Sequence, residues 1–378
     1  ETRWQARYIA EFFHFFAGCA DKIHGETLPI DKADMMVFTR REPLGVIAAV
    51  VPWNSQLFLS AVKIGPALAA GNTVVLKLSE HASAAMLEFG ELIAAAGIPP
   101  GVVNIITGHG DPCGKVLTSH KLVARVSFTG GLGAARQIIH NSANNFAQVS
   151  LELGGKSPIV VFDDANLDSA VNGALSGIFG ASGQSCVAGS RLLLQDTIAD
   201  AFLDRMVAMA GLIKIGDPLS DDTEMGPICT QGQLDCIERE VARALDEGGR
   251  LLCGGRRVEG LAGRFYHPTI IECPSPDLHI VDTEMFGPVL SVLRFKDEAD
   301  AVRLANHTEH GLAAGVFTRD GARQLRMVKA IKAGIVWVNT YRAVSFMAPC
   351  GGYKRSGIGR ESGQEAIREY LQTKTVWI

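Results

Sequence analysis

The chain has 378 residues, 47% hydrophobic and 20% charged, a composition typical of a globular α/β protein large enough for two domains. Its 36 Lys and Arg residues against 40 Asp and Glu residues leave a formal charge of −4, so no basic surface for nucleic acid or an anionic membrane is expected. No apolar run is long enough to span a bilayer, because Lys63 and Pro66 interrupt the best candidate over 57–71.

The first 150 residues predict a hairpin followed by alternating strands and helices. We expect a helix over 1–23 and two strands over 24–43, around a polar turn at 31–34. Beyond them, strands are expected at 45–51, 73–78, 102–107 and 123–128, and helices at 57–70, 82–96, 112–119 and 133–144. This alternation indicates a parallel, doubly wound sheet, whose strand C-termini share one edge where such sheets bind ligands.

A second α/β set is predicted from about residue 155 onward. Its expected helices are at 167–179, 199–212 and 234–247, and its strands at 159–162, 289–295 and 335–338. The tail over 373–378 is a short strand with nothing after it to pair with. We expect it to add to another subunit, with folding back onto its own sheet as the alternative.

The cysteine and histidine pattern indicates neither disulfides nor a metal site. The eight cysteines are scattered without a Cys-x-x-Cys pair, which predicts a reducing compartment and therefore a cytoplasmic location. His307 and His310 form a His-x-x-His pair without a nearby third ligand, so we expect a surface helix end there.

Polar motifs lie where the strands of the first set end. Asn54, in Pro-Trp-Asn, can donate its amide to a developing oxyanion or cap the next helix. Lys77 and Glu80 can hold ribose hydroxyls or cap a helix. The glycine turn over 128–133 opens a helix and suits a phosphate, although it is not a Gly-x-Gly-x-x-Gly fingerprint. Gly-His-Gly over 108–110 fits a loop better than a nucleotide site.

Two further residues are candidates for covalent and acid–base chemistry. Cys186 lies in the turn Gly-Gln-Ser-Cys, and a thiolate is the best ordinary nucleophile, although most cysteines are small buried hydrophobes. Glu152 lies in an apolar strand that runs into a double glycine. Its carboxylate is either exposed or desolvated with a raised pKa, and the second state suits a general base.

In their order along the chain, these motifs resemble those of the NAD(P)-dependent aldehyde dehydrogenases. The resemblance rests on Pro-Trp-Asn, the Lys77 and Glu80 pair, Phe-Thr-Gly, Glu-Leu-Gly-Gly-Lys-Ser-Pro and Gly-Gln-Ser-Cys. It continues through Glu-Met-Phe-Gly-Pro (284–288), Trp-Val-Asn (337–339) and the glycine-rich stretch 351–361. Any one of these motifs can occur by chance, but the whole set in this order is specific to the family.

The resemblance implies catalytic roles. Cys186 is expected to attack the aldehyde carbon, and Asn54 with the backbone N–H of Cys186 to hold the oxyanion. Glu152 is expected to activate the water that hydrolyses the thioester, and Glu361 resembles a carboxylate further along the proton path. Such a thiol needs a base or a cationic neighbour, because an ordinary thiol is mostly protonated at neutral pH.

The resemblance also implies a cofactor site. Lys77 and Glu80 resemble the pair around the adenine-side ribose, and Glu284 resembles the residue that holds the nicotinamide ribose, with Phe286 near that ring. Further cofactor contacts are implied for Trp53, Gly130 and Gly131. Because the carboxylate of Glu80 would repel a 2′-phosphate, NAD is predicted over NADP.

The implied fold class is α/β, with a Rossmann-like doubly wound cofactor domain (1–23 and 44–154) and an α/β catalytic domain (155–367). A β-hairpin oligomerisation arm and tail strand (24–43 and 368–378) predict a homodimer or homotetramer. The resemblance also implies that this chain lacks an N-terminal segment that family members carry. The alternatives are a coenzyme-A-acylating aldehyde dehydrogenase, a cofactor-independent cysteine hydrolase and a non-catalytic scaffold or binding relative.

Overall fold

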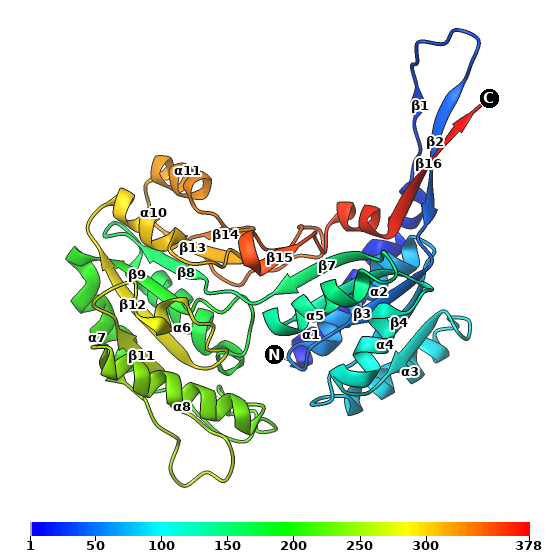
Figure 1. The fold of residues 1–378 in the computed structure, drawn as a ribbon. Coiled ribbons are helices and arrows are strands. Elements are labelled where there is room, and N and C mark those ends of the chain that lie inside the picture. Colours follow the sequence, from blue (N-terminus) through cyan, green and yellow to red (C-terminus); the bar gives the residue numbers. More distant parts are fainter. Residues whose placement is uncertain (1) are drawn as a thin grey trace. The chain divides into compact units, whose positions relative to one another are not determined.

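A computed structural model describes residues 2–378, so the first residue of the predicted N-terminal helix lies outside the described part. The chain divides into two compact units, which are described separately (Figure 1). The first unit comprises residues 1–153, 344–351 and 357–378, and the second comprises 154–343 and 352–356.

The first unit is built on a six-stranded sheet with the order β15-β7-β6-β3-β4-β5. Strands β3 to β7 run parallel, and β15 pairs antiparallel with β7. The parallel, doubly wound sheet predicted from the sequence is therefore confirmed. The bounds are Val46–Val50 (β3), Thr73–Lys77 (β4), Val103–Ile106 (β5), Val123–Gly130 (β6), Gln148–Leu153 (β7) and Gly357–Ile358 (β15).

The helices of the first unit also follow the prediction to within a few residues, except that α1 ends at Ala17 and not at residue 23. They are α1 (Thr2–Ala17), α2 (Gln56–Ala69), α3 (Ala84–Ala95), α4 (Lys115–Ser119) and α5 (Leu132–Ser142). Helix α1 packs on α2 and buries Phe12 and Phe16, and the Phe12 ring meets Phe58 edge to face. The aromatic spacing in α1 therefore marks a core face.

A three-stranded antiparallel sheet with the order β1-β2-β16 forms the arm. The hairpin of β1 (Thr27–Leu28) and β2 (Val37–Pro43) is confirmed. The primary expectation for the tail was wrong, because β16 (Leu371–Trp377) pairs with β2 of the same chain, from Leu371 opposite Pro43 to Trp377 opposite Val37. Strand β2 offers a second edge, and the backbone groups on one side of the tail are paired there, with β16 as an outer strand of the sheet.

The second unit contains a seven-stranded sheet with the order β10-β11-β12-β9-β8-β13-β14, parallel except for the edge strand β10. The strand bounds are Pro158–Val161 (β8), Arg191–Gln195 (β9), Arg250–Cys253 (β10), Thr269–Glu272 (β11), Val289–Phe295 (β12), Ala313–Phe317 (β13) and Ile335–Val338 (β14). The predicted strands are present, and β9, β10, β11 and β13 are additional.

Helices cover both faces of this second sheet. One hydrophobic cluster includes side chains of α8 to α11, and the other includes side chains of α6 and α7. The bounds are Leu167–Phe179 (α6), Ala199–Ala210 (α7), Gln231–Asp246 (α8), His279–Asp282 (α9), Glu298–Asn306 (α10) and Gly321–Ala330 (α11). Side chains of Asn166, Thr230, Asp297 and Asp320 cap the N-termini of α6, α8, α10 and α11.

Short helical turns complete the described elements, and they lie at Ala20–Lys22, Gly110–Gly114, Gly180–Gly183, Asp196–Ile198, Lys354–Ser356 and Gln364–Tyr370. Within residues 2–378, no helix is both long and apolar enough to cross a membrane.

Substituting Phe12→Ala is expected to destabilise the first unit by about 3–5 kcal/mol, because it removes a buried ring between α1 and α2 and leaves a cavity. The free energy of unfolding in urea measures this loss. The same substitution at Phe146, whose side chain is 92% exposed, is the matched control and is expected to change it by less than about 0.5 kcal/mol. Equal effects at the two positions would contradict the packing described for α1.

Candidate functional site

Cys186 follows a strained turn in the second unit. Ala181, Ser182 and Gly183 all adopt a left-handed conformation, with φ of 54°, 56° and 70°. Each non-glycine residue held in this region costs of the order of 1 kcal/mol. Position 183 admits only glycine, because a side chain there would overlap the carbonyl of Gly287. Cys186 itself is partly exposed.

Hydrogen bonds to a neighbouring segment hold this turn in place. The hydroxyl of Ser182 donates to the carbonyl of Gly226 at 2.9 Å. The amide of Gln184 donates to the carbonyl of Pro227 at 3.1 Å, and its oxygen accepts from the backbone N–H of Cys229 at 2.8 Å. The strain is thus offset by side chains that flank the cysteine.

A buried tyrosine anchors the main chain on the other side of the cysteine. The hydroxyl of Tyr341 donates to the carbonyl of Val187 at 3.0 Å. Its ring fits only because Gly177, Gly189 and Gly315 lack side chains, since a Cβ at any of them would crowd the ring. Burial raises the pKa of Tyr341, so the hydroxyl stays protonated and remains a donor. The sequence analysis did not predict this anchor.

Arg191 ties the end of the cysteine-bearing segment to the C-terminus of α10. The side chain is fully buried, and burial lowers its pKa to about 10. Its guanidinium donates to the carbonyls of Lys156, Leu304 and Ala305, each at 2.8 Å. A cation at this end of a helix is favoured by the helix dipole.

Glu284 lies against the double glycine that follows β7. Its carboxylate accepts a hydrogen bond from the backbone N–H of Gly155 at 3.2 Å, and a side chain at Gly154 would overlap that carboxylate. Burial raises the pKa of Glu284 to about 7, although the Gly155 N–H and Lys156 act in the opposite direction. Glu284 is therefore partly protonated at neutral pH. Phe286, two residues further along the chain, has a left-handed φ of 47°.

Lys156 is a fully buried amine. Among the described residues, its Nζ has no hydrogen-bond partner. Burial and repulsion from Arg191 lower its pKa to about 7. His310 lies nearby in the lining of the same small cavity.

The prediction that the His307 and His310 pair marks a surface helix end holds for His307, which is exposed at the end of α10, but is wrong for His310. The side chain is buried, and its Nδ1 lies 3.2 Å from the carbonyl oxygen of Gly154. Between residues 2 and 378, no three His, Cys, Asp or Glu side chains are grouped so as to hold a metal ion.

In the first unit, Glu152 is held in β7, opposite Thr129 of β6 and Gly357 of β15. Its side chain is buried, and within the described part of the chain its Oε1 has no hydrogen-bond partner. Burial, followed by the charge of Glu361, raises the pKa of Glu152 well above its usual value, while Lys63 opposes this shift. Of the two alternatives stated for Glu152, the desolvated carboxyl with a raised pKa is confirmed.

Lys63, Ser127 and Glu361 form a buried cluster near Glu152. Glu361 makes an ion pair with Lys63 and accepts from the hydroxyl of Ser127 at 3.0 Å, and Lys63 also donates to that hydroxyl at 3.1 Å. Lys63 and Ser127 were not among the site residues predicted from the sequence. The available signal was a lysine inside an otherwise apolar helix, since a buried lysine is rare unless it is paired.

Asn54 follows β3 and does not cap α2. The residue before the helix is Ser55, which has a left-handed φ of 50° and makes no side-chain cap bond. Its hydroxyl instead accepts from the amide of Gln5 at 3.0 Å. Trp53 and Asn54 are partly exposed in this turn. The alternative that Asn54 caps the helix is thus wrong.

Lys77, the last residue of β4, and Glu80, which follows the strand, lie close together. Lys77 is buried and its Nζ donates to the carbonyl of Leu78 at 2.9 Å, while 4.0 Å separates it from the carboxylate of Glu80. The other carboxylate oxygen lies 3.8 Å from Nδ1 of His109. The loop that we interpreted as unrelated to a nucleotide site therefore adjoins Glu80.

The N-terminus of α5 is suited to a phosphate group. Gly131 precedes the helix without a side-chain cap, and a Cβ at Gly131 or Gly133 would meet nothing within 4 Å. The first backbone N–H groups of a helix are unpaired within the helix and attract anions. Gly130 needs its missing side chain for another reason, because a Cβ there would overlap the ring of Phe128.

The predicted site residues fall into both units. Glu152 and Glu361 interact in the first unit, which also contains Asn54, Lys77 and Glu80. Cys186 and Glu284 belong to the second unit.

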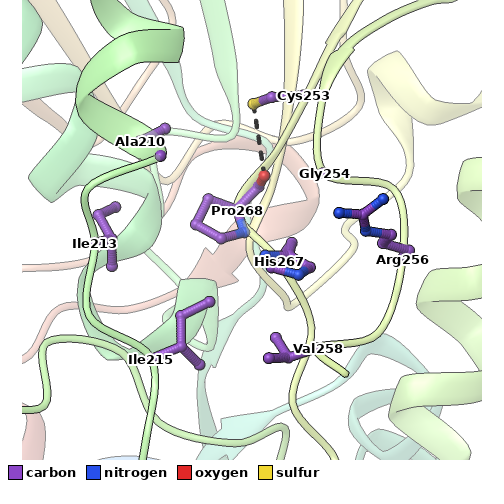
Figure 2. A pocket seen from close by; sticks show the side chains of 10 residues that line it. Ala210, Ile213, Ile215, Cys253, Gly254, Arg256, Val258, His267 and Pro268 are labelled. Atoms are coloured by element: carbon purple, nitrogen blue, oxygen red, sulfur yellow. Dashed lines mark hydrogen bonds between the residues drawn. The ribbon is translucent and has the colours of Figure 1, made fainter. Parts of the chain in front are cut away.

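A cavity of about 410 Å³ in the second unit contains none of the predicted site residues (Figure 2). Apolar side chains and two basic side chains surround it, and Figure 2 marks the contact from the Cys253 thiol to the Pro268 carbonyl at 3.6 Å. The lining residues are Ala210, Gly211, Ile213, Ile215, Cys253, Gly254, Arg256, Val258, His267 and Pro268.

Comparisons with known proteins agree on one family. The model of the aldehyde dehydrogenase family matches residues 1–376. The chain is 55% identical to (Z)-2-((N-methylformamido)methylene)-5-hydroxybutyrolactone dehydrogenase of Acinetobacter baylyi, covering all of this chain and 78% of that protein.

Two solved structures show the same fold. A putative aldehyde dehydrogenase from Burkholderia cenocepacia superposes with a TM-score of 0.97 at 44% identity, over 99% of this chain and 77% of that one. Betaine aldehyde dehydrogenase from Staphylococcus aureus, in complex with NAD+, superposes with a TM-score of 0.96 at 40% identity. The match covers 98% of this chain and 74% of that one.

Replacing Lys156 by Met is expected to stabilise the protein by about 1–4 kcal/mol near pH 7, because an unpaired buried amine is removed while the side-chain volume is kept. Folding lowers the pKa of Lys156 from 10.5 to about 7, so the unfolded chain binds the extra proton between these values. The destabilisation by Lys156 is therefore complete below about pH 7 and disappears as the pH rises towards 10.5.

Denaturant unfolding of both proteins at several pH values measures the gain from Lys156→Met, which should shrink with rising pH. Lys32→Met, at an exposed position of the arm, is the control and should show no such trend. A gain that is constant or grows with pH would contradict the analysis of Lys156.

Proposed function

Since the chain belongs to the aldehyde dehydrogenase family, we propose that it oxidises an aldehyde to the carboxylic acid with Cys186 as the nucleophile and Glu152 as the base for deacylation. The chain is an NAD-dependent oxidoreductase. The state of Glu152 carries the mechanistic part of the proposal. A desolvated carboxyl with a raised pKa and an oxygen without a partner in the described chain is suited to take a proton from water.

In the first step, the Cys186 thiol gives its proton to a base, a role also open to Glu152, and the resulting thiolate adds to the aldehyde carbon. The carbonyl oxygen becomes an oxyanion, which the amide of Asn54 and the backbone N–H of Cys186 stabilise. The clamped turn before Cys186 and the Tyr341 anchor after it support this step, because they fix the main chain that carries both the sulfur and the donor.

The residues present fit a dinucleotide. Lys77 and Glu80 would hold the adenine-side ribose, and the N-terminus of α5 would hold the pyrophosphate. Glu284 would hold the nicotinamide ribose. Trp53 and Phe286 are proposed to contact the same cofactor. When bound, NAD supplies the acceptor for the hydride that leaves the tetrahedral carbon. Loss of that hydride leaves an acyl thioester on Cys186.

Water then hydrolyses the thioester. Glu152 removes a proton from the water as its oxygen adds to the acyl carbon, and the Cys186 sulfur departs as a thiolate. The Lys63, Ser127 and Glu361 cluster supports this role, because it offers a hydrogen-bonded carboxylate that can receive the proton from Glu152. Glu361 acts here behind Glu152, as the resemblance implied.

Glu152→Gln is expected to slow steady-state turnover by roughly a hundredfold or more while a first-turnover burst of NADH remains, because deacylation requires Glu152, whereas the Cys186 thiol can also lose its proton to water. Stopped-flow detection of NADH separates the two phases. The steady-state rate of the unaltered protein should rise with pH, since Glu152 with its raised pKa is a base only when deprotonated, and the variant should lose this dependence. Cys186→Ala should abolish both phases.

Glu238→Gln, at an exposed carboxylate paired with Arg257, is the matched control and should behave as the unaltered protein. Turnover that accelerates with added coenzyme A, yielding an acyl thioester, would favour the acylating alternative instead. A Cys186→Ala protein with normal turnover would contradict the role of Cys186 as the nucleophile. An unaltered protein that forms no NADH with any aldehyde would favour the non-catalytic scaffold.

At about pH 8, kcat/KM is expected to be roughly tenfold or more higher with NAD than with NADP, because the Glu80 carboxylate repels a 2′-phosphate. Glu80→Gln should lower the ratio of kcat/KM with NAD to kcat/KM with NADP, because it should raise kcat/KM with NADP. A preference of the unaltered protein for NADP would overturn the role assigned to Glu80.

For the substrate we propose a class. The Acinetobacter relative is named for a 5-hydroxybutyrolactone. A lactone of this type is the ring-closed form of an aldehyde that also carries a carboxyl group. Aldehydes with a second acidic group are therefore the first to compare with simple aliphatic and with cationic ones, by kcat/KM.

Self-association and a cytoplasmic location complete the proposal. The arm sheet has β1 and β16 as its outer strands, and Met35, Met36 and Trp377 are exposed on it. Such edges favour pairing, which supports a homodimer or homotetramer built through the arm. The cytoplasmic location is proposed from the sequence, in which the eight cysteines are scattered without a Cys-x-x-Cys pair.

A further inference from the structure

His109 contacts the same carboxylate that we assign to the adenine-side ribose. Its Nδ1 lies 3.8 Å from Oε1 of Glu80, while Nζ of Lys77 lies 4.0 Å from Oε2. Each oxygen of this carboxylate therefore faces a basic side chain, one from β4 and one from the loop after β5. The imidazole is well exposed, at 77%, so a ligand at Glu80 can reach it.

The loop that carries His109 is held against this site. The carbonyl of His109 accepts from the backbone N–H of Gly114 at 3.2 Å, and the thiol of Cys113 donates to the carbonyl of Thr107 at 3.8 Å. A Cβ at Gly114 would lie 3.5 Å from the Lys77 side chain, so the loop packs on that lysine. The position of His109 beside Glu80 thus follows from a packed loop.

The charges around Glu80 are few. Lys77, His81 and His109 act on it directly, and together with a backbone hydrogen bond they lower its pKa, although burial alone would raise it. Asp111 and Lys115, in the same loop and the following helix, lie 3.8 Å apart and offset each other. The sum over Lys77 and Glu80 is zero, so the protonation of histidine decides the sign of the local charge.

We propose that His109 is a third residue of the adenine-side ribose site and makes the discrimination between NAD and NADP depend on pH. With a neutral imidazole, the Glu80 carboxylate repels a 2′-phosphate. With an imidazolium, the cluster carries a net positive charge and His109 can pair with that phosphate. The proposal rests on the assignment of Lys77 and Glu80 to this ribose.

The test measures binding, so it does not depend on catalysis. Calorimetric titration gives the Kd for NAD and for NADP at about pH 5.8 and pH 8.0, a range over which histidine side chains change charge. The readout is the ratio of the NADP to the NAD dissociation constant. Comparing variants at each pH cancels the ionisation of the 2′-phosphate, which acts equally in all of them.

His109→Ala is expected to raise this ratio roughly two- to fivefold at the lower pH and to leave it unchanged at the higher pH, a size typical of an exposed ion pair. His109→Lys, which stays charged, should give a low ratio at both pH values. His140→Ala, on α5, is the matched control and should behave as the unaltered protein.

Ratios that are identical in His109→Ala and the unaltered protein at both pH values overturn the role of His109. So does an equal loss of NAD and NADP binding, which would indicate a structural role for the loop. If the unaltered protein binds NAD but Glu80→Gln leaves the ratio unchanged at the higher pH, the ribose assignment itself fails. The last outcome differs from the first two, so the two failures are distinguishable.

Discussion

The main chain at Gly154 and Gly155 runs so close to its surroundings that neither position can carry a side chain. A Cβ at Gly154 would overlap the carboxylate of Glu284, and one at Gly155 would lie 2.9 Å from the carbonyl oxygen of Cys186. The carbonyl of Gly154 also accepts from Ser356 at 2.8 Å. This close approach places the segment that carries Cys186 and the segment that carries Glu284 beside the start of the second unit. The arrangement of the candidate groups in that unit depends on it.

Two charged groups with perturbed pKa values lie beside this stretch. The half-exposed Glu284 has its carboxylate against Gly154, and the neighbouring Lys156 is fully buried with its amine. Each ionic form is costly in such a place, so the two groups titrate near neutrality instead. The stability of this region and the charge of Glu284, which we propose to hold the nicotinamide ribose, therefore both depend on Glu284 and Lys156.

In the first unit, the cost of burying charged groups is offset in a different way. Lys63 and Glu361 neutralise each other and share the Ser127 hydroxyl, whereas Glu152 remains without a partner for one oxygen among the described residues. Pairing offsets part of the cost of burying Lys63 and Glu361, whereas the desolvated carboxyl of Glu152 is costly to ionise and is therefore more basic. One partly satisfied group beside a hydrogen-bonded cluster fits the proton acceptor and onward path that we propose for Glu152 and Glu361.

Much of the fold was readable from local pattern. Alternating apolar runs and helical periods predicted the elements of the first unit, and the ordered motifs indicated the family that the comparisons then showed. The roles of Lys63, Tyr341 and His109 were not readable, because each depends on a contact with a residue distant in the chain. Lys63 and Glu361 are separated by 298 positions, and nothing local to either residue predicts the other.

The sequence by itself determined the α/β alternation, the candidate nucleophile and base, and the family, because these are carried by periodicity and by short motifs. Only the tertiary structure decided that the tail strand pairs with β2, that Asn54 does not cap α2 and that His310 is buried. The physical reason is that burial and strand pairing arise where distant segments meet, and the free energy of those contacts overrides what each segment favours alone.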